Sequence, residues 1–308
     1  MTENVKEIYD TVYSNSILFL NRGITEVLSH NNLLDEALDR ETGIISSLFT
    51  QMSIELALKA YLIKEKGIKS ILLDKYKNKT EPEIYTAFLK NSLHTKQYND
   101  LKIIIIKNKT QIFSDDDFLQ LDQFQQFRNL IVHLNLKLAD ADLFDLKYEI
   151  IYVMVHIIIP LLTKINLEFE SPTSFYDKYL NKSAYQKLIS YEPYVSEMEK
   201  LAINCSGISY SCPVCRKKTF SPDNNLCYCC NLNLEYAVEY TDCLKCKNKN
   251  SVIFDHLNIE QNHNVMDGQC LHCDSRIKVL KCPKCGNTYT FLDKQELTKC
   301  TPDKCYFY

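Results

Sequence analysis

All 14 cysteines of this 308-residue chain lie after residue 204. Twelve of them form six short motifs that each bring two cysteines close together: Cys212 and Cys215, Cys227 and Cys230, Cys243 and Cys246, Cys270 and Cys273, Cys282 and Cys285, and, with a wider spacer, Cys300 and Cys305. A Cys-x-x-Cys motif supplies two thiolate ligands from one tight turn, so two motifs complete the tetrahedral shell of a zinc ion. Paired in order, the motifs predict about three zinc ions in three tandem zinc ribbons, which they resemble.

Some residues near the motifs leave the ligand assignment open. Cys229 competes with Cys230, although Cys-x-x-Cys spacing favours Cys230, and Cys205 stands outside the pairs. Three histidines in or near the second ribbon could each replace a cysteine, although four cysteines already complete that shell; they are His256, His263 and His272. A shell of four cysteines has no open position for water or substrate, so we interpret the zinc ions as structural.

The abundance of cysteine in metal-type motifs indicates a compartment in which thiols stay reduced. The first residues contain no basic segment followed by an apolar stretch, as a secretory signal would. The longest apolar run, Ile150–Leu162, has 13 residues, fewer than the roughly 20 that cross a bilayer. We therefore expect a cytoplasmic protein with no membrane segment, and a buried helix at Ile150–Leu162.

The chain before the cysteines has helical periodicity. Apolar residues recur at helical spacing over long segments, at 4–30, 33–66 and 140–168. Gly67 is placed to end the second of these helices, and Ser114 to cap a helix that opens with three aspartates. Glu81-Pro82-Glu83 is typical of a helix start, whereas Ile103–Ile106 is compatible with either a strand or a buried helix.

These patterns predict two folded regions with a connection between them. We expect an all-α helical bundle over residues 1–170, a helical linker over 171–204, and a small β-rich zinc-ribbon array over 205–308.

A polar cluster interrupts one apolar helical segment, Phe127–His133. On a helical wheel, Asn129 and His133 lie four residues apart on the face away from the apolar stripe, and Arg128 flanks them. A histidine can transfer a proton at neutral pH, and a guanidinium can bind a phosphate through two hydrogen bonds. This cluster could therefore act on a phosphodiester.

The motif of Arg128, Asn129 and His133 resembles the R-x4-6-H motif of HEPN-domain ribonucleases. An earlier helix carries Glu55 and Lys59, and it is similar to the acidic and basic helix of that family, although two such residues can also form an ordinary i,i+4 ion pair. The resemblance covers roughly residues 4–168. It implies an all-helical bundle that forms a homodimer, with two motifs facing each other across a cleft.

The resemblance also implies that the protein cleaves RNA without a catalytic metal. His133 would take the 2′-OH proton or protonate the leaving 5′-oxygen, and Arg128 would bind the phosphate as its charge builds. Asn129 would orient the histidine or the phosphate. The products would carry 2′,3′-cyclic phosphate and 5′-hydroxyl ends.

Two functions are compatible with these features. The first is an endoribonuclease of a bacterial toxin or anti-phage system, whose zinc ribbons bind RNA or a trigger such as a regulatory or phage protein. The second is a non-catalytic dimeric adaptor that binds nucleic acid or protein through its ribbons.

The net charge of −3 gives no general attraction to nucleic acid, so any contact must come from local patches. Basic residues gather near the cysteine motifs and are interleaved with aromatic residues that could stack on bases. The basic residues are Arg216, Lys217, Lys218, Lys245, Lys247, Lys249, Lys278, Lys281 and Lys284, and the aromatic residues are Phe220, Tyr228, Tyr289 and Phe291.

Overall fold

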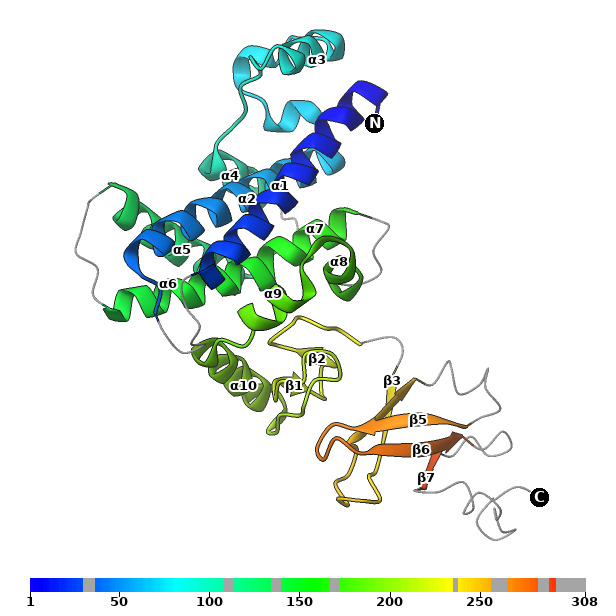
Figure 1. Ribbon diagram of the computed structural model, residues 1–308. Helices are drawn as coiled ribbons and strands as arrows, with labels where there is room; N and C mark the ends of the chain where they lie inside the picture. Colours follow the sequence, from blue (N-terminus) through cyan, green and yellow to red (C-terminus); the bar gives the residue numbers. More distant parts are fainter. Residues whose placement is uncertain are drawn as a thin grey trace. The chain divides into compact units, whose positions relative to one another are not determined.

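The computed structural model describes residues 1–29, 37–107, 113–133, 140–166, 172–234, 238–255, 265–281 and 288–291. The chain forms two compact units, Met1–Tyr194 and Val195–Tyr308. The described part of the first unit is helical, and that of the second consists of short antiparallel strands that follow one helix (Figure 1). The predicted order, a helical region followed by small sheets with cysteine clusters, is confirmed.

The helices of the first unit begin and end largely where the sequence signals stand. Their bounds are α1 (Glu3–Ser29), α2 (Arg40–Lys66), α3 (Glu81–Leu89), α4 (Tyr98–Lys107), α5 (Asp115–His133), α6 (Asp140–Tyr152), α7 (Ile159–Ile165), α8 (Pro172–Tyr179) and α9 (Lys182–Leu188), while α10 (Glu192–Ser206) leads into the second unit. Helices α8 and α9 lie in the segment 171–204, which the sequence predicts to be a helical linker, and they fall within the first unit. Two short 3-10 turns, Ile68–Ile71 and Asp74–Tyr76, connect α2 to α3.

Three local signals act as the sequence indicated. Gly67 ends α2 with a φ of 81°, which a residue without Cβ adopts freely. Ser114 accepts a hydrogen bond from the Asp117 amide at 3.1 Å and donates to the Asp117 carboxylate at 2.8 Å, which satisfies the start of α5. The isoleucines of Ile103–Ile106 lie in helix α4, not in a strand.

Helix α2 lies along α1 and is buried on most of its sides, as its sequence predicts (Figure 1). Ser16 of α1 and Ser53 of α2 are fully buried, and each hydroxyl donates to the other residue's carbonyl, at 2.8 and 2.9 Å. Because both side chains are small and satisfied, the two helix backbones can approach closely without leaving a buried polar group unpaired.

Helices α6 and α7 are joined by a π-helical stretch, Val153–Ile158. Asp142–Ile165 is long and apolar enough to cross a membrane, but 72% of its most apolar stretch is buried inside the protein, as in a core helix. The predicted buried helix is confirmed. Within the π-helical stretch, His156 stacks on Tyr152 with ring centres 4.5 Å apart, and its Nε2 lies 2.9 Å from the Tyr194 hydroxyl.

The second unit contains two antiparallel sheets. Strand β1 (Phe220–Ser221) pairs with β2 (Leu226–Cys227), and a five-stranded sheet follows in the order β3-β4-β5-β6-β7. Its strands are β3 (Val238–Thr241), β4 (Val252–Asp255), β5 (Val265–Cys270), β6 (Arg276–Lys281) and β7 (Thr288–Phe291). Strand β7 lies between the two cysteine motifs of the predicted third ribbon, yet it pairs with β6 of the second. This part of the third ribbon is therefore continuous with the second instead of separate from it.

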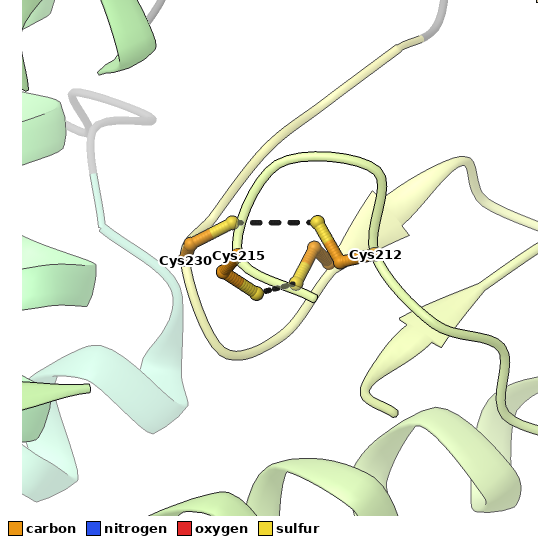
Figure 2. A group of neighbouring side chains, drawn as sticks. Cys212, Cys215 and Cys230 are labelled. Atoms are coloured by element: carbon orange, nitrogen blue, oxygen red, sulfur yellow. Dashed lines mark hydrogen bonds between the residues drawn. The ribbon is translucent and has the colours of Figure 1, made fainter. Parts of the chain in front are cut away.

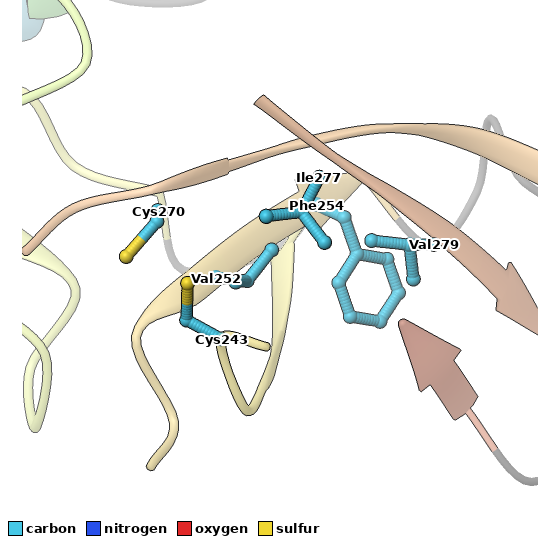
Figure 3. Packing of buried hydrophobic residues seen from close by; sticks show 6 residues of the cluster. All are labelled: Cys243, Val252, Phe254, Cys270, Ile277 and Val279. Atoms are coloured by element: carbon cyan, nitrogen blue, oxygen red, sulfur yellow. The ribbon is translucent and has the colours of Figure 1, made fainter. Parts of the chain in front are cut away.

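One face of the five-stranded sheet carries a small apolar core (Figure 3). The core contains Val252, Phe254, Ile277 and Val279, packed with two cysteines. A Cβ at Gly268 would lie 2.7 Å from side-chain atoms of both Val252 and Val279, so only glycine fits there.

Helix α6 carries a carboxyl group that is nearly excluded from solvent. Glu149 is 7% exposed, and the side-chain amide of Gln120 on α5 can donate to its Oε2 at 2.8 Å. Burial, with a smaller contribution from the Asp145 charge, raises the pKa of Glu149 to about 7. This carboxyl is therefore protonated in the folded protein at pH values where an exposed glutamate has ionised.

We predict that the Glu149 carboxyl makes the free energy of unfolding fall as the pH rises. Below about pH 4.5 it is neutral in both states; between about 4.5 and 7 the folded state binds a proton that the unfolded state has lost, so the free energy of unfolding falls with pH. Glu149→Gln should remove this slope and, above pH 7, stabilise the first unit by on the order of 1–3 kcal/mol. The free energy of unfolding is measured at pH 5 to 8 by urea unfolding, with the helical circular dichroism signal as the readout. Asp145→Asn, at an exposed position, should leave most of the slope; an unchanged slope in Glu149→Gln would contradict the assignment.

Candidate metal centres and the motif of helix α5

Two groups of four cysteines converge in the described residues of the second unit. The first contains Cys212, Cys215, Cys227 and Cys230, and the second contains Cys243, Cys246, Cys270 and Cys273. Within each group all four sulfur atoms lie within 4.8 Å of one another. The pairing of neighbouring motifs that we predicted from chain order is confirmed for these two groups.

The sulfur–sulfur distances match those of a metal shell. Cys212 and Cys230 are 3.7 Å apart, as are Cys215 and Cys227 (Figure 2). The corresponding distances in the second group are 3.8 and 3.7 Å. Four sulfurs each about 2.3 Å from a central zinc ion would be roughly 3.8 Å apart in a tetrahedron, whereas a disulfide bond is about 2.05 Å long. The donor sets therefore fit structural zinc ions.

A repeated backbone hairpin holds the two cysteines of each motif. The amide of the first cysteine donates to the carbonyl five residues later, as in Cys212 to Lys217 at 2.8 Å and Cys243 to Asn248 at 3.0 Å. The same bond occurs from Cys227 and from Cys270. This hydrogen bond lies within one motif, so the local backbone alone fixes the separation of the two cysteines.

The residue after the second cysteine has a positive φ in all four of these motifs. The values are 63° at Arg216, 55° at Asn231, 63° at Lys247 and 56° at Asp274. This left-handed conformation favours glycine. The turn after Cys215 forms with Arg216 in place of glycine, and its backbone is strained for that reason.

Sheet topology brings the motifs of the second site together. Cys243 and Cys246 lie in the β3–β4 connection, whereas Cys270 and Cys273 lie at the end of β5 and in the β5–β6 turn. In an antiparallel meander these two connections lie at the same end of the sheet, so the four thiolates meet there. Hydrogen-bond donors surround the sulfurs; the Cys273 amide, for example, donates to Cys270 Sγ at 3.4 Å, which stabilises a thiolate.

The described residues settle part of the ligand question. Cys230 belongs to the first group and Cys229 does not, as the spacing favoured. Cys205 and His272 are exposed and outside both groups. The predicted third site, Cys282, Cys285, Cys300 and Cys305, lies outside the described residues, as do His256 and His263.

The first two ribbons contact each other. The Ser211 amide donates to the Leu271 carbonyl at 2.9 Å, and Arg216 Nη1 lies 3.2 Å from Asp274 Oδ1. Arg216 and Asp274 are the positive-φ residues of motifs from different zinc sites. The two sites therefore lie in one continuous structure.

Helix α5 contains the backbone of the predicted catalytic motif in its last turns. Asn129 is exposed and accepts a hydrogen bond from Gln125 at 3.2 Å, whereas Leu121 and Phe124 on the same helix are buried. His133 is the last residue of α5, and the helix period places its backbone position on the face of Asn129. The side chains of Arg128 and His133 lie outside the described residues, so their roles stay a prediction.

Glu55 and Lys59 of α2 form an ion pair at 2.6 Å. Lys59 is only 7% exposed, and its partner is partly buried. The pair is better shielded from solvent than a surface ion pair, and it satisfies a charge inside the bundle. Both interpretations of this pair, helix stabilisation and a role at a site, are compatible with this contact.

The predicted nucleic-acid surface needs two corrections. Phe220 in β1 is fully buried and Phe291 in β7 is only 6% exposed, so neither ring can stack on a base. Several of the predicted cations are exposed, namely Arg216, Lys218, Lys245, Lys247 and Lys249. Lys281 (its side chain) and Lys284 lie outside the described residues.

Comparison with known proteins found no match to a family model, a curated protein or a solved structure. The metal centres and the α5 motif are therefore interpreted from their own residues.

The zinc content can be measured by native mass spectrometry of the full chain. We expect about three zinc ions per chain. Cys230→Ala should lose one zinc ion because it opens the first shell, whereas Cys229→Ala, a control at the adjacent buried cysteine, should retain all of them. Loss of zinc from Cys229→Ala alone would contradict the first site as described.

The positive φ at Lys247 gives a second test. Lys247→Gly should stabilise the zinc-bound second unit by about 0.5–1 kcal/mol, because glycine adopts this conformation without strain. Lys245→Gly in the same turn, also exposed and outside the positive-φ positions, should destabilise it slightly. Thermal unfolding in the presence of zinc compares the two variants; stabilisation of both, or of Lys245→Gly only, would be incompatible with this account.

Proposed function

We propose that this protein is a cytoplasmic, metal-independent endoribonuclease of the HEPN type, with structural zinc ribbons that bind RNA or a trigger. The observation that carries the proposal is the placement of the α5 motif. Asn129 is exposed in the last turns of α5, whereas Phe124, about 140° away around the helix at about 100° per residue, is buried in an all-helical unit. A polar side chain at Asn129 is therefore available to a substrate and contributes little to the core.

In the proposed reaction, the 2′-OH of RNA attacks the adjacent phosphorus and the 5′-oxygen leaves. His133 moves the proton, because an imidazole has an ordinary pKa close to neutral pH. Arg128 binds the phosphate oxygens as negative charge develops, and Asn129 orients the histidine or the phosphate. The products carry 2′,3′-cyclic phosphate and 5′-hydroxyl ends.

The zinc sites have a different role in this proposal. Each of the two described sites has four cysteine sulfurs, which complete a tetrahedral shell and leave no ligand position for substrate. Their contribution is to hold a small unit that presents exposed cations to RNA or to a regulatory or phage protein.

We further propose that the active species is a homodimer. One chain supplies a single histidine in the motif, whereas proton transfer to and from the reacting oxygens suits two facing motifs. A bacterial toxin or anti-phage role would follow from an RNA-cleaving activity that a trigger controls.

A non-catalytic adaptor is the second candidate. It is favoured by the docked pair of ribbons, whose motifs expose the apolar tips Val214 and Leu244 beside the cations. Such tips suit contact with a protein partner.

A cleavage assay separates the two functions. Purified wild type and His133→Ala are incubated briefly with total RNA and EDTA, and the fragment ends are analysed. His133→Ala should reduce cleavage by about 100-fold or more, because it removes the proton-transfer group. His94→Ala, at an exposed loop position, is the matched control and should cleave like wild type. Equal cleavage by His133→Ala would reject the site, and absence of cleavage by wild type would favour the adaptor.

A further inference from the structure

A cavity of about 530 Å³ lies on the first unit, away from the residues assigned above. Helix α1 forms one wall, and the ends of α2, α7 and α8 form the others. Its lining includes Lys6, Tyr9, Tyr13, Lys64, Asn166 and Tyr179. It shares no residue with the α5 motif or with the cysteine groups.

The tyrosines of this cavity are held in place by the end of α7. The last carbonyls of a helix have no partner within the helix. Here Tyr9 donates to the Ile165 carbonyl at 3.1 Å, and Tyr13 donates to the Leu162 carbonyl at 3.3 Å. These bonds hold both rings in place; Tyr13 is only 6% exposed, so the half-buried ring of Tyr9 is the part of this pair that a ligand can reach.

The rings form an ordered aromatic wall. Tyr9 and Tyr13 stack with centroids 5.9 Å apart and planes 19° from parallel. Tyr179 meets Tyr13 edge to face at 6.4 Å. A planar ligand can stack on or insert beside such a wall, and base–aromatic stacking of this type tolerates any base.

The charged residues of the cavity favour an anion. Lys6 is paired with Asp10 at 3.1 Å, and both are exposed. Lys64 is half-buried and donates to the Ile165 carbonyl at 2.5 Å. Burial raises the pKa of Tyr9 to about 12, so this phenol carries no negative charge at neutral pH. Two lysines and one aspartate leave the lining with a positive balance.

We propose that this cavity binds a nucleoside monophosphate unit, with the base against the tyrosine rings and the phosphate beside Lys6 and Lys64. The volume lies within the range of about 300–1,000 Å³ that small-molecule sites occupy. The unit can come from a free nucleotide or from one residue of single-stranded RNA. This site goes beyond the proposed function, because the cavity shares no residue with the α5 motif. Its occupancy can be measured as binding, whether or not the protein cleaves RNA.

Tyr9→Trp provides a direct probe, because the sequence contains no tryptophan. The full-length variant is titrated with AMP, ribose 5-phosphate and inorganic phosphate, and with a 2′-O-methyl hexa-adenylate that a 2′-OH mechanism cannot cut. We expect saturable quenching of tryptophan emission by AMP or by the hexamer, and weaker binding of the two ligands that lack a base. Tyr76→Trp, outside the cavity, should show no saturable change.

The source and the phosphate contact are read from the same titrations. Saturation by AMP identifies a free nucleotide, and saturation by the hexamer alone identifies RNA. Adding Lys6→Met to the probe variant should weaken binding about tenfold, whereas Lys75→Met, at an exposed position elsewhere, should not. If Tyr9→Trp does not fold, the binding of AMP and of the hexamer to wild type is measured by calorimetry instead. No saturation by either ligand at millimolar concentration, or binding of AMP no tighter than that of phosphate, would overturn the proposal.

Discussion

The convergence of cysteine thiols in groups of four is the constraint on which the second unit depends. Its five-stranded sheet has only a small apolar core, to which Cys243 and Cys270 themselves contribute. Such a core contributes little of the stability that a domain needs, and a metal ion bound by four thiolates would supply much of the missing folding free energy. The strained backbone at Arg216 and Lys247 is tolerated because four sulfurs must meet at one point.

The first unit is stabilised differently, by apolar helices that pack around α2. Several polar groups inside it are paired, as between Ser16 and Ser53 or between Lys59 and Glu55. The two units therefore divide the physical tasks. Four cysteines would complete the shell of a metal ion in each described group, which leaves proton transfer and phosphate binding, in our proposal, to the α5 motif of the helical unit.

Much of this arrangement could be predicted because the signals are local. Gly67 and Ser114 act within one helical turn, and Cys-x-x-Cys spacing fixes each half of a metal site. Long-range packing was not predictable in the same way. The burial of Phe220 and Phe291 depends on how their strands pack, and aromatic character fits a core as well as a binding surface.

The sequence by itself determined the helical and zinc-binding regions, the cysteine pairs and the polar positions of α5. Only the tertiary structure decided that β7 extends the second ribbon's sheet and that Tyr9, Tyr13 and Lys64 gather around the end of α7. The physical reason is distance along the chain. Hairpins and caps join residues a few positions apart, whereas these contacts join segments whose meeting depends on how whole helices and strands pack.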